Sequence, residues 1–593
     1  MNISAGKRSG MKRGRNTAKS DRDPMAVWPS SANVLETLVE TIRGASSAVA
    51  GAVAPDSSWR SYWVGRVFLL LPLFLLPYVG ARRQSPLLSA AETAVREVAG
   101  TPHASRFTRA ATETWDILKI ESKKVGSQST SIRPLVRNEQ ALVEIRSTQR
   151  LSIKRFEQLT EQSLESVWLE SPAGELIEFE TTERTGRERT RTLGAVRGGK
   201  LLITVETTGK SERTEIAWPD PRAGWYRVEH MLANEPLRPG ERRELQVLMP
   251  IVNQLATVEL QAREIETTNL LDQPRELLRI DRKDRLGNTE LVSVAWMDAS
   301  GAILKTMIPG LGLETHRATR ELAESSKDRS GFDLGEATVV KLDRPLTVPH
   351  LRERVVYRAT LDGSSAERIF AEGASQSIRR ISERQVEITV RAIRPATRLD
   401  VNSEAEPTED DRSPNSWIQA DDRRIREMAE EASGDERDAW AVACRLEKFV
   451  RSQIRTKSFS QAFLSAAEVA RSGEGDCTEH AVLLAALCRA RNIPARVAIG
   501  LVYYPPSAGF AYHMWNEVWI VDRWIPLDAT IGNGGIGGGH LKLATSNLKG
   551  SDSRAVFLPV SQLLGRLKLE LVEVASVPDK STNRGPDSPP DRR

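Results

Sequence analysis

The sequence predicts a multidomain α+β protein, in which tandem antiparallel β-rich domains precede a C-terminal α+β domain. Two patterns support this fold class. Between residues 113 and 345, apolar and polar residues alternate with a period of two, for example at Leu201, Ile203 and Val205, which is typical of half-buried antiparallel strands. After residue 416, apolar helical runs come before hairpin-like segments. A chain of 593 residues has room for three to five such domains.

The N-terminal segment carries the positive charge of the chain. We predict that residues 1–63 are disordered and basic. The first 23 residues contain seven Lys or Arg and two Asp, which accounts for the whole formal net charge of +5. The remainder is close to neutral, so the pI of 9.0 does not indicate a nucleic-acid-binding surface.

A signal for export follows at residues 64–81. Residues 67–79 are uninterrupted apolar sequence, which suits a signal-peptide core and is marginal for a membrane span. Positive charge before this run predicts a cytoplasmic N-terminus. We therefore expect the chain beyond about residue 82 to lie on the periplasmic side of the cell envelope. The apolar segment is either a signal peptide that is cleaved or a single transmembrane helix that anchors the chain.

The middle of the chain is predicted to consist of β-rich modules. Residues 82–112 form a helical connector. Trp168 and Trp296 lie in similar hairpin-like segments 128 residues apart, which predicts two tandem β-rich domains, residues 113–218 and 219–345. Neither predicted domain contains an evident set of catalytic residues, so we expect each to bind a partner or to act as a spacer. Residues 346–400 form a small β segment, and residues 401–415 form an acidic, Pro-containing linker.

The C-terminal domain is predicted to span residues 416–575 as its own folding unit, before a disordered, Pro-rich tail at 576–593. Its central feature is Cys477. Asp476 and Glu479 have the spacing of a reciprocal helix cap, which places Cys477 in the first turn of an apolar helix that ends near Arg491. The free N–H groups and the dipole of that helix end favour a thiolate over a thiol.

A predicted hairpin carries His513 and Asp528, and two registers are open. A two-residue turn at Asp522 and Arg523 would pair Glu517 with Asp528 and leave His513 about 13 Å away. A four-residue loop over residues 519–522 would place His513 opposite Asp528. A His base oriented by an Asp is the arrangement that activates a Cys nucleophile.

Four short blocks resemble the transglutaminase-like superfamily, in the same order. They are GDCTEHA around Cys477, IPARVAIGL after the helix, HMWNEVW around His513 and WIPLDAT around Asp528. The resemblance covers about residues 415–575. Asn492 stands where the family usually has Gly, and it suits the same left-handed helix end. The β-rich copies before these blocks are similar to exported bacterial proteins that contain this domain.

The resemblance implies a papain-like fold and a role for each site residue. Cys477 would be the nucleophile, His513 the base and Asp528 the acid that orients it. Trp515 and Trp524 match the aromatic positions that wall the site and contact substrate. The resemblance also implies the register that places His513 opposite Asp528.

No cofactor or metal is expected. His480 forms a Cys-x-x-His pair with Cys477, but no second ligand pair has zinc spacing. The glycine-rich run at residues 532–539 lacks the Gly-Lys-Ser/Thr of a phosphate loop, and we predict a flexible rim beside the cleft. Cys444 and Cys488 lie in apolar helical runs and are expected to be inert.

These observations predict a cysteine enzyme that transfers the acyl group of an amide through a thioester. Hydrolysis by a peptidase or amidase acting on cell-envelope proteins or peptides is the reading we favour. Protein-glutamine cross-linking by a transglutaminase fits the resemblance equally well. A non-catalytic envelope-binding or scaffold protein is the alternative of another class. The sequence identifies neither the substrate nor the oligomeric state.

Overall fold

The computed structural model describes residues 111–575, apart from short gaps at 156–157, 187, 208–209, 288, 326–331, 364–365, 398–403, 457–462 and 551–552. The predicted basic segment, the apolar run, nearly all of the helical connector and the C-terminal tail lie outside the described residues. Within the described part of the chain, no helix is both long enough and apolar enough to cross a membrane.

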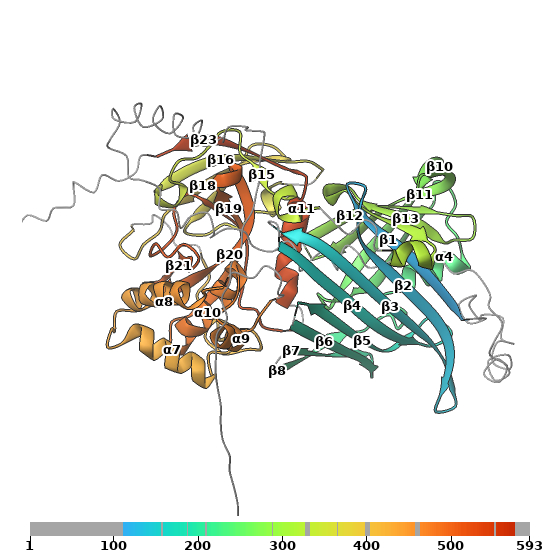
Figure 1. Cartoon of the computed structure of the whole chain (residues 1–593), viewed down its shortest axis with the longest axis horizontal. Coiled ribbons are helices and arrows are strands. Elements are labelled where there is room, and N and C mark those ends of the chain that lie inside the picture. Colours follow the sequence, from blue (N-terminus) through green and yellow to red (C-terminus); the bar gives the residue numbers. More distant parts are fainter. Residues whose placement is uncertain are drawn as a thin grey trace, which may run out of the picture. The chain divides into compact units, whose positions relative to one another are not determined.

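The largest sheet contains fourteen antiparallel strands in the order β8-β7-β6-β5-β4-β3-β2-β1-β14-β13-β12-β11-β10-β9. Figure 1 shows the part of this sheet from β1 to β8. Every pairing in this sheet joins strands that are consecutive in sequence, except the pairing of β1 with β14, and the consecutive strands β8 and β9 lie at its two ends. The strands are β1 (Thr112–Ile120), β2 (Lys123–Arg137), β3 (Gln140–Arg155), β4 (Gln158–Glu170), β5 (Leu176–Thr185), β6 (Glu188–Arg197), β7 (Lys200–Thr207), β8 (Lys210–Ala217), β9 (Arg242–Met249), β10 (Gln254–Leu270), β11 (Gln273–Leu286), β12 (Thr289–Met297), β13 (Ile303–Ile308) and β14 (Leu313–Ala318).

The two predicted β-rich domains share this one sheet, so the predicted division near residue 218 does not separate two sheets. Pairing runs from Trp115 with Ala318 to Ile120 with Leu313, and it joins the first strand to the last. Both Trp hairpins exist, as β4–β5 and β12–β13. Alternation of side chains identifies the two faces of a strand, but it does not identify the strand's partner. The sequence therefore predicted the strands, but not that they pair in one sheet.

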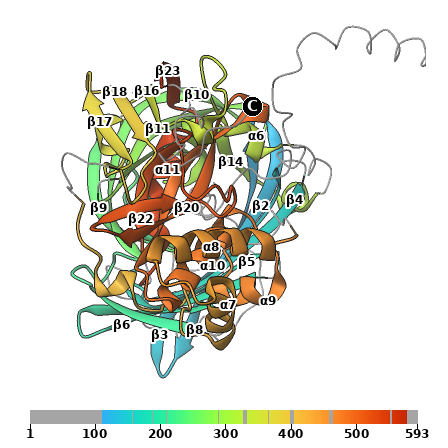
Figure 2. The same cartoon turned by 90° about the vertical axis from the view of Figure 1, so that its left-hand side faces the viewer.

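The second sheet carries the candidate site and has helices beside it. Its order is β15-β20-β19-β22, and β21 pairs with β20. Figure 2 shows helices α7, α8, α9 and α10 gathered together. The strands are β15 (Val340–Lys341), β19 (Ala495–Tyr504), β20 (Gly509–Ile520), β21 (Arg523–Leu527) and β22 (His540–Ser546), and the helices are α7 (Arg423–Ser433), α8 (Ala439–Gln453), α9 (Ala466–Ser472) and α10 (Cys477–Ala490).

Helix α10 is the centre of this part of the core. Residues 477–489 are all buried, and the helix packs against β19, β20 and the three other helices. A helix that is apolar all round is stable only when it is enclosed in this way. Asn492 follows with a left-handed φ of 59°, as predicted for the helix end.

The third sheet joins segments that the sequence analysis assigned to different domains. Its order is β17-β18-β16-β23, so the small β segment pairs with the last strand of the predicted C-terminal domain. The C-terminal fold therefore incorporates chain from Val340 onward, since β15 also pairs with β20. The strands are β16 (Arg354–Leu361), β17 (Gln376–Arg380), β18 (Gln385–Arg391) and β23 (Leu567–Val574), and the other short helices are α4 (Arg227–Asn234), α5 (Arg320–Glu324), α6 (Leu334–Ala337) and α11 (Leu558–Leu563).

A buried charge cluster fastens the predicted linker to the second sheet. Glu517 on β20 pairs with Lys542 on β22 at 2.7 Å and with Arg496 on β19 at 2.6 Å. Glu404 from the predicted linker pairs with Arg496 at 3.3 Å and with Lys542 at 3.6 Å. Burial opposes ionisation of Glu517, but the two cations outweigh it and lower its pKa. Residues 404–415 are consequently part of the packed fold and not a free linker.

Candidate active site

Cys477 lies at the capped start of α10, as predicted. Asp476 accepts a hydrogen bond from the Thr478 N–H at 2.9 Å, and Glu479 accepts one from the Asp476 N–H at 2.9 Å. Glu479 also accepts from the Leu464 N–H at 3.1 Å, so its charge is occupied by backbone donors. The Cys477 side chain is buried, and it lies close enough to His513 to help raise the pKa of that imidazole. The helix cap therefore fixes the position of this thiol.

The hairpin that carries His513 has a register between the two that were considered. Its turn is at Val521 and Asp522, both with left-handed φ values of 51° and 62°. Asn516 pairs with Leu527 at the end of the ladder, so the same register continued by one residue would place Trp515 opposite Asp528. Both predicted registers are wrong by two residues in opposite directions. A two-residue turn of type I′ needs positive φ at both positions, and a β-branched Val is an unusual residue there.

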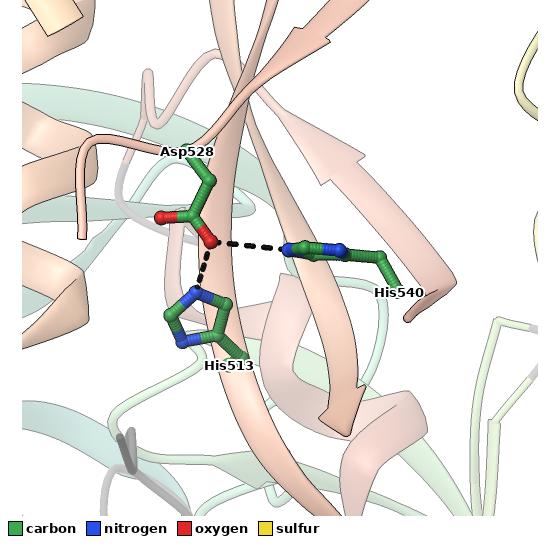
Figure 3. Close-up of side chains that lie close together, drawn as sticks. All are labelled: His513, Asp528 and His540. Atoms are coloured by element: carbon green, nitrogen blue, oxygen red, sulfur yellow. Dashed lines mark hydrogen bonds and ion pairs between the residues drawn. The ribbon is translucent and has the colours of Figure 1, made fainter. Parts of the chain in front are cut away.

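His513 and Asp528 nevertheless meet, because they are diagonal neighbours on one face of the hairpin. The His513 Nε2–H donates to Asp528 Oδ2 at 2.8 Å (Figure 3). Thr530 supplies two further donors to Asp528 Oδ1, its N–H at 2.9 Å and its hydroxyl at 2.5 Å. With Nε2 turned to Asp528, the other ring nitrogen, Nδ1, is left to face Cys477. The order is thiol, imidazole, carboxylate.

A second histidine, which the sequence analysis missed, also binds the carboxylate. His540 at the start of β22 donates from Nε2 to Asp528 Oδ2 at 3.0 Å (Figure 3). The Trp515 ring lies beside both imidazoles, with its centroid 6.2 Å from that of His513 and 5.1 Å from that of His540. The chain has seven His residues, and a His directly after a glycine run was the available signal.

The glycine-rich run at residues 532–539 leads directly into His540, and it is packed rather than a flexible rim. Residues 535–539 are buried. The Gly538 N–H donates to the Arg352 carbonyl at 2.9 Å, and the Gly538 carbonyl accepts from the Tyr357 hydroxyl at 2.7 Å. A Cβ at Gly538 would lie 2.3 Å from a Val355 methyl carbon. Glycine is needed here because two backbone segments pack in contact, which is a structural reason and not a sign of mobility.

Charges at the site follow from burial and from these contacts. Burial opposes protonation of His513, but the charges and hydrogen bonds of Asp528 and Cys477 together raise its pKa to about 10. Burial would raise the pKa of Asp528, but the bonds to His513 and His540 hold it well below its usual value. Burial lowers the pKa of His540 and lowers that of His480 to about 4. At neutral pH the site holds a cationic His513, an anionic Asp528 and neutral histidines around them.

The two predicted aromatic residues lie in different surroundings. Trp515 contacts the imidazoles, and Gly500 on β19 makes room for it, since a Cβ there would lie 2.9 Å from the ring. The Trp524 ring lies 3.9 Å below the Arg496 guanidinium, and its Nε1–H donates to the Ala405 carbonyl at 3.0 Å. Trp524 thus belongs to the charge cluster that fastens the predicted linker. The substrate contact expected of each Trp stays a prediction.

Glu447 on α8 supports the backbone around Asp528. Its carboxylate accepts hydrogen bonds from the N–H groups of Asp528 at 3.1 Å, Gly534 at 2.7 Å and Gly535 at 3.4 Å. The side chain is fully buried, and burial raises its pKa to about 7 against the opposing effect of these donors. Glu447 therefore connects the helical layer to the start of the segment that ends at His540.

His513, Asp528 and His540 are the one group within the described residues whose ligand atoms are close enough to hold a metal ion, all within 4.8 Å of one another. The 2.8 Å and 3.0 Å separations are those of hydrogen bonds. Ligands of one Zn²⁺ lie about 2.0–2.1 Å from the ion and hence roughly 3.3 Å from each other. A bound ion would also require loss of both Nε2 protons. The geometry fits two imidazole donors on one carboxylate better than a cation.

A helix-end thiol, a strand imidazole and an adjoining carboxylate define the site of a papain-like cysteine enzyme. Comparison with known families agrees with this class. Residues 426–529 match the model of the transglutaminase-like superfamily. The chain therefore carries a transglutaminase-like superfamily domain, and the resemblance of the sequence blocks to that family is confirmed.

Solved structures give weaker likenesses. A "putative cysteine protease" from Cytophaga hutchinsonii is 16% identical, with a TM-score of 0.23, over 37% of this chain and 83% of that one. A "beta-barrel-like protein of domain of unknown function" from Brucella abortus is 8% identical, with a TM-score of 0.26, over 35% and 93%. A "putative protease" from Parabacteroides distasonis is 10% identical, with a TM-score of 0.15, over 58% and 64%. No curated protein matches the sequence.

Proposed function

We propose that the C-terminal domain is a cysteine enzyme that hydrolyses amide bonds in proteins or peptides of the cell envelope. The observation that supports it best is the chain of contacts from the Cys477 thiol through the His513 ring to Asp528. A nucleophile then adjoins a base, and the base is hydrogen-bonded to a group that orients it, as covalent acyl transfer requires.

The reaction follows from the positions of these groups. The Cys477 sulfur attacks the amide carbonyl carbon, and the His513 imidazolium gives its Nδ1 proton to the nitrogen of the departing amine. The C–N bond breaks, the amine leaves and a thioester remains. Water then loses a proton to the neutral His513 and attacks the thioester, the C–S bond breaks, and the carboxylic acid leaves, which restores the thiolate and imidazolium pair. Asp528 keeps Nε2 protonated throughout, so that Nδ1 always faces the sulfur.

Hydrolysis and cross-linking differ only in what attacks the thioester. The test incubates the purified protein, and a Cys477→Ser variant as its matched control, with cell-envelope proteins and a labelled primary amine. We expect Cys477-dependent new N-termini or free carboxylates by mass spectrometry. Amine incorporation without any new cleavage product would instead support a protein-glutamine transglutaminase. Identical results from the two proteins would support the binding or scaffold alternative.

We also propose that the catalytic domain acts outside the cytoplasm. The basic start of the chain and the apolar run at residues 64–81 support this location. A reporter enzyme that is active only after export, fused after residue 100, is expected to be active. An active cytoplasmic reporter at the same position would contradict both the location and the choice of envelope substrates.

A further inference from the structure

We propose that His540 is a positioning residue for the candidate triad, and that its Nε2–H fixes the plane of the Asp528 carboxylate so that Oδ2 stays directed at His513. This inference rests on the proposed cysteine chemistry. It adds a fourth side chain to the three that the sequence motifs identify.

The hydrogen bonds on Asp528 divide into two pairs. Thr530 holds Oδ1 with two donors, whereas Oδ2 receives one bond from His513 and one from His540. The carboxylate therefore has four donors, and it is only 1% exposed. Without His540, the bond to His513 would be the one restraint on Oδ2, and that bond must persist while His513 gains and loses a proton.

Packing holds the His540 ring in the orientation that this role needs. The His540 ring makes a T-shaped contact with each of two neighbouring rings. The centroid of Trp515 is 5.1 Å away at an interplanar angle of 71°, and that of His350 is 5.5 Å away at 74°. A Cβ at Gly539 would lie 2.9 Å from the Pro349 Cβ and 3.0 Å from a His350 ring carbon, so the approach of the chain to His540 is tight. Rotation of the imidazole away from Asp528 would collide with these neighbours.

The tautomer of His540 is also determined by its surroundings. Among the described residues, no hydrogen-bond partner lies at its Nδ1, whereas its Nε2 faces a carboxylate oxygen. A single proton on Nε2 satisfies this arrangement, and a second proton on Nδ1 would be buried without an acceptor. Burial and the cationic His513 lower the pKa of His540, although Asp528 opposes them. The neighbouring His350 is likewise kept neutral by burial.

A neutral donor serves Asp528 better than a cationic one would. Lys or protonated His at this position would neutralise the carboxylate and weaken its attraction for the His513 imidazolium. Neutral His540 orients the carboxylate by a hydrogen bond and leaves its negative charge to act on His513. The titratable groups around the ring are Asp528, His513 and His350, and the first is the one anion among them.

The test needs no knowledge of the substrate, because Cys477 alkylation by iodoacetamide reports on the imidazole–thiol pair. It compares full-length His540→Leu and His540→Gln with the wild type between pH 5 and 10. Leu fills the space without a donor, whereas the Gln amide places an N–H near the position of Nε2. We expect Leu to slow alkylation at pH 6 about tenfold or more, and Gln to stay within about threefold of the wild type. His350→Gln, which alters the neighbouring ring but not the bond to Asp528, is the matched control.

Two results would overturn the positioning role. The first is a pH profile of the Cys477 alkylation rate in His540→Leu that superimposes on that of the wild type. The second is an alkylation rate in His540→Gln that is as low as in His540→Leu, although the two variants have equal thermal stability. If the Leu variant does not fold, imidazole ¹⁵N NMR of the wild type decides, since a deprotonated Nε2 on His540 at pH 7 would contradict the proposal. Failure of the proposed function has a different signature, namely that wild-type Cys477 reacts no faster than it does in the unfolded chain.

Discussion

Replacing His513 by Ala is expected to slow alkylation of Cys477 at pH 6 by about a hundredfold or more, and far less at pH 9. A free thiol ionises near pH 8.5, so only about one thiol in three hundred is thiolate at pH 6, whereas most are at pH 9. The raised pKa of His513, about 10, keeps the imidazolium present across this whole range. The wild-type rate should therefore change little from pH 6 to pH 9, and the variant rate should rise steeply.

The other two cysteines are internal controls for this measurement. Burial, with a smaller contribution from Glu447, raises the pKa of Cys444 to about 11, and burial raises that of Cys488 further. Peptide mass spectrometry after timed alkylation separates all three sites in one sample, and both controls should react far more slowly than Cys477. Asp528→Asn should act like His513→Ala but more weakly, because the ring remains and only its orientation is lost. Native and denatured rates that agree, with no effect of either substitution, would identify Cys477 as a structural cysteine.

Glu447→Ala is expected to lower the free energy of unfolding by about 3 kcal/mol or more, because two buried N–H groups and one partly buried N–H group lose their acceptor. The pKa of Glu447 is raised by folding to about 7, so the protonated form is bound more favourably in the native state. Its contribution to stability is complete below the unfolded pKa of 4.5 and declines as pH rises through 7. The loss on substitution should therefore be greater at pH 5 than at pH 8.

Urea unfolding at the two pH values measures this difference. Lys448→Ala, at an exposed position one residue along the same helix, is the control and should change stability by no more than about 0.5 kcal/mol. A loss that grows between pH 5 and pH 8 would contradict the sign. Equal stability of Glu447→Ala and the wild type would show that water replaces the carboxylate.

Local patterns predicted many of the elements and singled out three residues of the candidate site. The helix cap formed by Asp476 and Glu479 involves residues only three positions apart, so it could be predicted from the sequence. Side-chain alternation is also a local property. It therefore predicted the strand at Lys200–Thr207 and the last strand, Leu567–Val574. Cys477, His513 and Asp528 were found because each lies in a block of characteristic residues.

Contacts between distant segments could not be predicted in this way. His540 binds Asp528 only because a packed glycine run turns the chain back to the sheet, and composition alone made that run look mobile. The register of the hairpin depends on Val521, whose left-handed conformation its own preference disfavours. The pairing of β1 with β14 and of β16 with β23 depends on which edges meet, which alternation does not encode.

The pairing of β1 with β14 has a consequence for how the chain folds. When Ile120 has been synthesised, its partner Leu313 is still roughly 190 residues away, which at 5–20 residues per second is about 10–40 s. Throughout that time one edge of β1 has no partner and can pair with another chain. The contact order of this sheet is correspondingly high, which makes its completion slow relative to the formation of each hairpin. Any truncation that removes Leu313–Ala318 leaves that edge permanently open, and we expect aggregation there before any loss of structure at the candidate active site.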